Sequence, residues 1–195
     1  MAISDRVGEA IKKILEKDYE NAIVQISIAL DSTSKRAYGG DKVGERFRRF
    51  ITEHEEFIIY VTLGCGPRFY YEGDAKKQGA FKFGARGKLA NVIYKYVRNA
   101  LLHEGDLSSD VVLREGSIMG HEGDKFILGS EMIMGLLLSV IGAPVNAKER
   151  LDEPCSFSYG EANLPLDKLW GKLDTIKKTI NYVEKPSNQA LQPTA

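Results

Sequence analysis

Apolar residues recur at spacings of three and four along most of the chain, as they do in helices that bury one face. Two such stretches open the sequence, and Ser4 is a candidate N-cap for the first. Their apolar positions are Val7, Ala10, Ile11, Ile14 and Leu15, followed by Ala22, Ile23, Ile26, Ala29 and Leu30. The second pattern ends before Gly39-Gly40, so we expect a pair of helices joined by a short break.

A third and longer helical pattern begins near Asp41 and continues to Val61. Its apolar side includes His54, which we interpret as a packed and hydrogen-bonded histidine rather than a ligand or a catalyst. The fourth pattern runs from Leu89 to Leu101 and has the stripe of a core-facing helix.

Residues 131–143, which follow Ser130, are apolar on all sides. A helix of this length is too short to cross about 30 Å of hydrocarbon, so we expect a buried central helix or a dimer-interface helix. A last helix is predicted from Leu166 to Val183, with Asn163 and Pro165 as its start signals.

Two short apolar runs interrupt the helical patterns at 110–114 and 125–128. Turn residues separate them, so they predict a β-hairpin, with His121 in the glycine-rich connection. The fold class that we predict is therefore mainly α, a helical bundle of about six helices with a small β-hairpin insertion near 110–128. A single domain is expected over 1–184, and the polar residues 185–195 are expected to form a disordered tail.

Composition narrows the class of protein further. The 195 residues carry 27 basic and 27 acidic side chains, so the whole chain is not a general nucleic-acid-binding polycation. The amino-terminal residues do not resemble a signal peptide, and Cys65 and Cys155 lack the number and spacing of a disulfide framework. We therefore expect a cytoplasmic protein with no membrane segment.

Basic charge nevertheless gathers in the first half of the chain. Six basic residues lie between Lys35 and Arg49, and eight lie between Arg68 and Arg98. Residues 64–87 combine glycine, aromatic and basic residues, which predicts a long loop able to stack bases and hold phosphates. The candidate RNA contacts are Arg68, Lys76, Lys77, Lys82, Arg86 and Lys88. The alternative is that the aromatic residues only attach this loop to the bundle.

The sharpest chemical signal is the polar group Arg98, Asn99 and His103, crowded into the end of the fourth helical pattern just before Gly105. Arg98 is a permanent cation with forked donors, Asn99 is a neutral hydrogen bonder, and His103 can exchange a proton near neutral pH. Together they could bind and act on a phosphate. On a regular helix, however, Arg98 and His103 lie about 140° apart around the axis.

No phosphate-binding glycine loop, dinucleotide fingerprint, His-Glu-x-x-His or paired-cysteine zinc pattern occurs in the sequence. We accordingly expect no metal ion and no cofactor. The chemistry would then have to come from ordinary side chains.

The run Arg98-Asn99-Ala100-Leu101-Leu102-His103, at the end of an amphipathic helix in a helical chain, resembles the HEPN superfamily, the higher eukaryotes and prokaryotes nucleotide-binding domains. Many members are dimeric, metal-independent endoribonucleases of toxin–antitoxin, phage-defence or RNA-processing systems. The resemblance implies that Arg98 holds the phosphate, His103 is the general acid or base, and Asn99 orients one of them or the RNA. It also implies a homodimer whose two motif helices complete the site, and for a toxin an antitoxin partner.

Two rival interpretations stay open at this stage. One is a non-catalytic HEPN-like module that binds a nucleotide or a partner protein. The other is a purely structural helical protein in which Arg98 and His103 cap a helix or bond a neighbouring acid.

Overall fold

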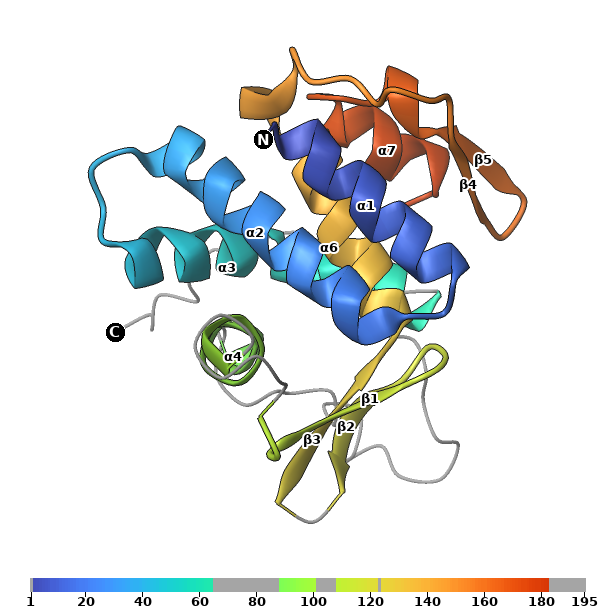
Figure 1. The fold of residues 1–195 in the computed structure, drawn as a ribbon. Coiled ribbons are helices and arrows are strands. Elements are labelled where there is room, and N and C mark those ends of the chain that lie inside the picture. The colour runs from blue at the N-terminus through green and yellow to red at the C-terminus, as the bar shows by residue number, and fades with distance from the viewer. Residues whose placement is uncertain (1, 65–87, 101–107, 123, 183–195) are drawn as a thin grey trace, which may run out of the picture.

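A computed structural model describes residues 2–64, 88–100, 108–122 and 124–182 of the chain (Figure 1). Within these residues the chain is mainly helical, with small β-sheets, which confirms the predicted fold class. The α-helices are α1 (Ile3–Leu15), α2 (Tyr19–Tyr38), α3 (Val43–Leu63), α4 (Lys88–Val92), α6 (Glu131–Gly142) and α7 (Leu173–Thr179).

Helix α6 is the buried centre of the bundle. Helices α2, α3 and α7 all pack against it, and α1 lies along α2 (Figure 1). Ten of its twelve residues are buried, from Met132 to Gly142 with the exception of Met134. Of the two roles that the sequence left open for this segment, the structure shows the buried central helix. A Cβ atom on Gly135 would lie 2.8 Å from the Ile58 carbonyl oxygen, so only glycine lets α3 approach this closely.

The residues described include no helix that is both long enough and apolar enough to cross a membrane. Helix α6, the most apolar of them, has 12 residues and is covered by its neighbours in the bundle.

The predicted β-hairpin is present, but its strands pair differently from the expectation. A three-stranded sheet has the order β1-β3-β2, from β1 (Val111–Arg114), β2 (Met119–Glu122) and β3 (Lys125–Gly129). Strands β2 and β3 form the hairpin, whereas β1 and β3, the two runs expected to pair as a hairpin, are parallel. His121 therefore lies in a strand and not in a connection.

The reason lies in the turn between β1 and β2. The Gly129 N–H donates to the Ile118 carbonyl at 2.7 Å, which holds this turn against the end of β3. A Cβ atom on Gly129 would lie 2.2 Å from the Gly116 carbonyl oxygen, so the close approach requires glycine. The chain reverses its direction at this turn, and β3 lies between β1 and β2 in the sheet.

The carboxyl-terminal region differs most from expectation. A second hairpin, β4 (Ser156–Tyr159) with β5 (Ala162–Pro165), occupies the place of the expected helix start. A short 3-10 helix, η4 (Leu166–Lys168), follows, and α7 begins only at Leu173. Gly171 interrupts the helical pattern with φ +74°. The apolar residues Leu166, Leu169 and Trp170 are buried as expected, although no single helix carries them.

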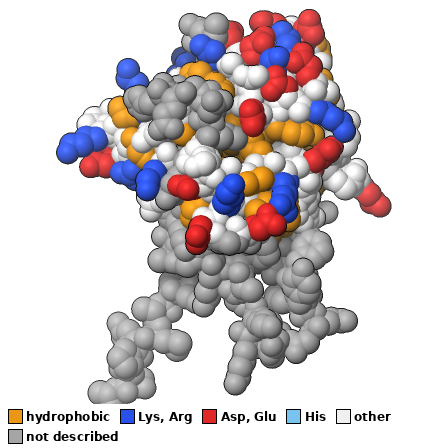
Figure 2. Space-filling view, turned by 60° about the horizontal axis from the view of Figure 1, so that its bottom comes forward, with side chains coloured by type: hydrophobic (Ala, Val, Ile, Leu, Met, Phe, Trp, Pro, Cys, Tyr) orange, Lys and Arg blue, Asp and Glu red, His pale blue; other side chains and the backbone are white. Residues whose placement is uncertain are grey.

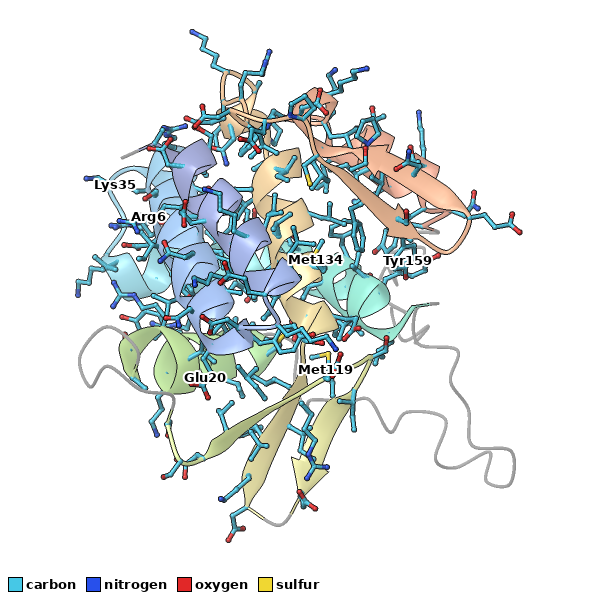
Figure 3. All side chains as sticks on the ribbon, turned by 45° about the vertical axis from the view of Figure 1, so that its right-hand side comes forward. Arg6, Glu20, Lys35, Met119, Met134 and Tyr159 are labelled. Carbon is cyan, nitrogen blue, oxygen red and sulfur yellow. The ribbon has the colours of Figure 1, made fainter. Side chains whose placement is uncertain are left out.

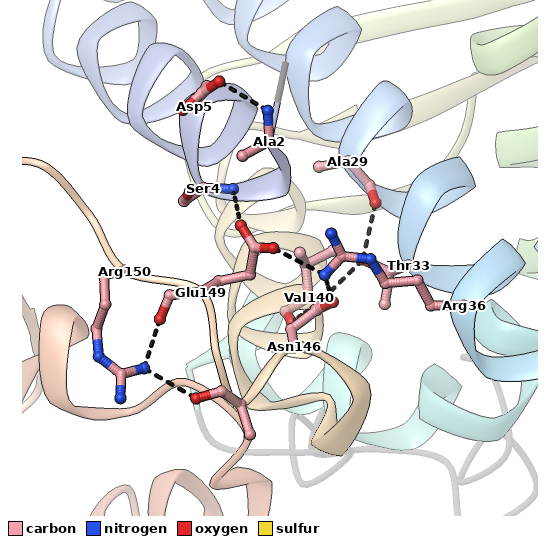
Figure 4. Close-up of polar contacts among 11 residues, drawn as sticks. Ala2, Ser4, Asp5, Ala29, Thr33, Arg36, Val140, Asn146, Glu149 and Arg150 are labelled. Atoms are coloured by element: carbon pink, nitrogen blue, oxygen red, sulfur yellow. Dashed lines mark hydrogen bonds and ion pairs between the residues drawn. The ribbon is translucent and has the colours of Figure 1, made fainter.

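Contrary to expectation, Ser4 is not the N-cap of the first helix. The start of this helix is instead hydrogen-bonded by a residue that is distant in the sequence (Figure 4). Helix α1 begins at Ile3, and the Ser4 N–H donates to Glu149 Oε2 at 2.8 Å. Glu149 Oε1 also accepts from Arg36 Nη1 of α2 at 2.8 Å. Burial alone would raise the pKa of Glu149, but these hydrogen bonds outweigh it and lower that pKa. One carboxylate thus joins α1, α2 and the segment after η3 (Pro144–Asn146).

His54 is a packed histidine, which confirms the prediction from sequence. Its ring stacks on Phe50 with centroids 4.2 Å apart. Nδ1 lies 2.8 Å from the Phe50 carbonyl oxygen, and because a carbonyl can only accept, Nδ1 carries a proton. Burial lowers the pKa of His54 below its ordinary value of 6.5, against smaller opposing effects of the Phe50 hydrogen bond and the Glu53 charge, while Lys177 adds to the lowering.

This lowered pKa predicts a pH dependence of stability. As pH falls below 6.5 the unfolded chain takes up a proton at His54 before the folded chain does, so the free energy of unfolding falls until pH reaches the lowered folded-state value. Above pH 6.5 the contribution is complete. We expect the free energy of unfolding of His54→Gln, measured by urea denaturation, to fall less between pH 8 and pH 5 than that of the wild type. Equal losses in the two proteins would contradict the prediction.

Candidate functional site

Arg98 and Asn99 end a short π-helix, η2 (Ile93–Asn99), which continues directly from α4. The segment is helical as predicted, and its stripe of Leu89, Val92, Ile93, Val97 and Ala100 is buried. Its second half, however, closes hydrogen bonds between residues five apart instead of four. Such π-helical turns are rare and occur frequently at functional sites. The angle expected between Arg98 and His103 depends on residues that lie outside the described part of the chain.

The Arg98 guanidinium is held by three neighbours. Nη1 donates to Asn99 Oδ1 at 2.9 Å, and Nη2 lies 3.7 Å from Asp31 Oδ2 of α2. The carbon Cζ lies 5.6 Å from the centre of the Tyr94 ring, within the range of a cation–π contact. Only 13% of the Arg98 side chain is exposed. The two residues that the motif places side by side are thus brought together as one hydrogen-bonded unit.

Asp31 is shared with a second arginine. Its Oδ1 lies 3.4 Å from Arg46 Nη2 of α3, and Arg46 Nη1 donates to the Asp41 carbonyl at 3.4 Å. Two guanidinium groups therefore face one carboxylate, which leaves a net charge of +1 in this group. The Nε atoms of Arg46 and Arg98 are both buried and have no hydrogen-bond partner among the residues that the structure describes. A partly buried group with excess positive charge and unused donors has the electrostatic character of an anion site.

A hollow of about 430 Å³ opens beside this group. Its lining includes Arg48 of α3, Tyr94, Lys95 and Asn99 of η2, and Phe126 of β3. Arg48 Cζ lies 4.6 Å from the centre of the Tyr94 ring, so two arginines, Arg48 and Arg98, lie within cation–π range of Tyr94. Cations beside exposed aromatic rings are the combination that binds phosphates and stacks bases.

The fold therefore joins two basic runs that are separate in the sequence. Arg46 and Arg48 come from the run between Lys35 and Arg49, whereas Lys95 and Arg98 end the run that starts at Arg68. Basic residues do not dominate the surface outside this site on the side drawn in Figure 2. In Figure 2 the Lys and Arg side chains on the side shown are interspersed with Asp and Glu.

Several predicted site residues lie outside the described part of the chain. These are His103 and, among the candidate RNA contacts, Arg68, Lys76, Lys77, Lys82 and Arg86. Lys88 is the first residue of α4. His121 is paired in register with Phe126 in the β2–β3 ladder, and Phe126 lines the hollow beside Asn99.

Sequence reasoning did not find Asp31, Arg46, Arg48 or Tyr94. Asp31 belongs to a different helix from the motif, and its position one residue after the buried Leu30 was the only available signal. Arg46 and Arg48 were counted only among the six basic residues between Lys35 and Arg49. Their convergence on Arg98 and Tyr94 follows from how α2, α3 and η2 pack.

No group of three or more His, Cys, Asp or Glu residues that could hold a metal ion occurs within the described ranges. Cys155 is a free cysteine, and burial raises the pKa of its thiol. Cys65 lies outside the described residues.

The protein is mainly helical, and at the end of its π-helical turn Arg98 shares the carboxylate of Asp31 with Arg46. The chain belongs to the Rv1289 family, whose family model matches residues 2–192. No curated protein matches the chain. No solved structure matches it either.

Proposed function

We propose that this protein is a metal-independent endoribonuclease of HEPN type that acts as a cytoplasmic homodimer. The observation that carries the proposal is the hydrogen-bonded Arg98–Asn99 unit beside a hollow lined by Arg48 and Tyr94. Arg98 and Arg46 share the single carboxylate of Asp31, so one positive charge is left over. An RNA phosphate at this place would complete the charge balance that Asp31 leaves incomplete.

In the proposed reaction Arg98 binds the scissile phosphate and stabilises the charge that develops on its oxygens. His103 accepts the proton of the ribose 2′-hydroxyl or donates a proton to the leaving 5′-oxygen. The 2′-oxygen then forms a bond to phosphorus while the bond to the 5′-oxygen breaks, which leaves a 2′,3′-cyclic phosphate. Asn99 holds Arg98 in place through the 2.9 Å hydrogen bond.

The test is incubation of the purified protein with a labelled single-stranded RNA in EDTA. We expect cleavage products that end in 2′,3′-cyclic phosphate. RNA that stays intact would contradict the proposal, provided that mass spectrometry shows no antitoxin-like partner bound to the preparation. A toxin would have such a partner, whereas a defence or processing enzyme would not need one.

One observation favours a second function, a non-catalytic module that binds a nucleotide or a partner protein. Arg98 already has Asp31 as its ion-pair partner, and most of its side chain is covered. A module of this kind would bind RNA without cleaving it, and replacement of His103 would change the affinity alone.

A further inference from the structure

A separate cavity of about 690 Å³ lies between the β4–β5 hairpin, the end of α3 and the start of α6. It shares no lining residue with the hollow beside Asn99. Tyr159 at the end of β4 attaches the hairpin to α3 by donating to the Tyr60 carbonyl at 2.9 Å. Figure 3 shows Met134 on α6 and Tyr159 on β4, two of the residues that line the cavity. This volume is in the range of sites that bind small molecules.

One wall of the cavity is aromatic. The rings of Phe157 and Tyr159 have centroids 6.4 Å apart, and that of Tyr60 follows 6.2 Å from Tyr159. Three neighbouring aromatic residues on one wall are a common feature of sites that bind organic cations.

The charged groups of the cavity all have one sign. Glu131 and Glu161 line it, and none of the described residues around it is Lys, Arg or His. Ser130 Oγ accepts from the Gly116 N–H at 3.0 Å and donates to Glu131 Oε2 at 2.8 Å, which fixes the carboxylate in place. Among the residues described, neither glutamate has an ion-pair partner within 4.0 Å. A fixed, unpaired carboxylate beside aromatic rings favours a cation.

A second cavity of about 240 Å³ adjoins the first, since Glu131, Met134 and Phe157 line both. Its other walls are mostly apolar and include Ile14 and Leu15 of α1. Leu15 is 78% exposed, so this apolar wall is open to solvent at the end of α1. The carboxylate of Glu131 thus stands at the junction of an aromatic space and an apolar one.

We propose that these two adjoining cavities bind an organic amine, with its ammonium group at Glu131 and its apolar body along Phe157 and Met134. The inference does not depend on the ribonuclease proposal, because it uses none of the residues around Arg98.

The test compares three probes with the same phenylbutyl body: 4-phenylbutylamine, 4-phenylbutanol and 5-phenylpentanoate. We expect calorimetry at pH 7 to show the amine binding at least about tenfold more tightly than the alcohol or the acid. The chain has four methionines, so methyl-¹³C-methionine spectra can locate the site. The amine should shift the Met134 signal, which a Met134→Leu variant assigns.

Glu131→Gln keeps the shape of the side chain and removes its charge. We expect it to weaken amine binding about tenfold and to leave alcohol binding unchanged, whereas Glu56→Gln, an exposed acid on α3 outside both cavities, should behave as the wild type. If Glu131→Gln fails to fold, Phe157→Leu tests the aromatic wall in its place. Equal binding of the three probes by the wild type, no binding of the amine, or an unchanged affinity in both variants would overturn the proposal.

Discussion

Replacing His103 by alanine is expected to reduce RNA cleavage by about 10²- to 10⁴-fold, the contribution typical of a general acid or base. Arg98→Ala should cause a loss of at least similar size, because it removes both the phosphate ligand and the positive charge that stabilises the transition state. Rates are measured with the labelled RNA in EDTA. Thermal unfolding of each variant establishes that the fold is retained.

Two further variants make this experiment specific. Arg150→Ala removes an arginine whose hydrogen-bond partners in the described part of the chain are the backbone carbonyls of Ala147 and Glu149, so we expect wild-type cleavage. Asp31→Asn removes the carboxylate that competes with phosphate for Arg46 and Arg98, so we expect tighter RNA binding at some cost in stability. Full cleavage by His103→Ala, or loss in Arg150→Ala as large as in Arg98→Ala, would contradict the assigned roles.

The second large effect is expected on stability, at Asn146. Its side chain is fully buried, and Nδ2 donates to Thr33 Oγ1 and to the Val140 carbonyl, both at 2.9 Å (Figure 4). Its Oδ1 accepts from Arg36 Nη1 at 3.3 Å. Asn146→Ala would leave a small cavity and remove the shorter of two hydrogen bonds to the Val140 carbonyl, which keeps the Ala143 N–H at 3.3 Å. We expect a loss of about 3 kcal/mol in the free energy of unfolding.

Urea denaturation at pH 7 measures this loss. Asn163→Ala is the matched control, since Asn163 is exposed in β5, and its effect should stay within about 0.5 kcal/mol. A loss below about 1 kcal/mol for Asn146→Ala would mean that water replaces the amide and that this contact is not what joins α2 to η3.

The helices were the most predictable part of the fold. Helices α2 and α3 follow their apolar periodicity, α6 follows its continuous apolar run, and the packing of His54 followed from its place on the apolar side of α3. The pattern of apolar residues predicted the structure less well where a single glycine decides the path of the backbone. Gly171 ends a periodic stretch at a left-handed φ, and Gly129 lets a turn approach β3 so that the pairing of strands changes.

The candidate site divides in the same way. Arg98 and Asn99 were identified from their types and their place near a helix end, and the structure joins them by a hydrogen bond. Asp31 and Arg46 could not be identified, because no local pattern links α2 or α3 to η2. The change from α- to π-type hydrogen bonding is also a property of packing that residue spacing does not reveal.

By itself the sequence determined which faces are buried, because the period of apolar residues decides which side of each helix leaves water. It also determined which chemical groups are available, and Arg98, Asn99 and His103 are the group on which the proposed function rests. Only the tertiary structure decided which charges meet. Ion pairs depend on distance in space, so the sharing of Asp31 by Arg46 and Arg98, and the position of Glu131 beside three aromatic residues, appear only when α2, α3, α6 and the β4–β5 hairpin are packed together.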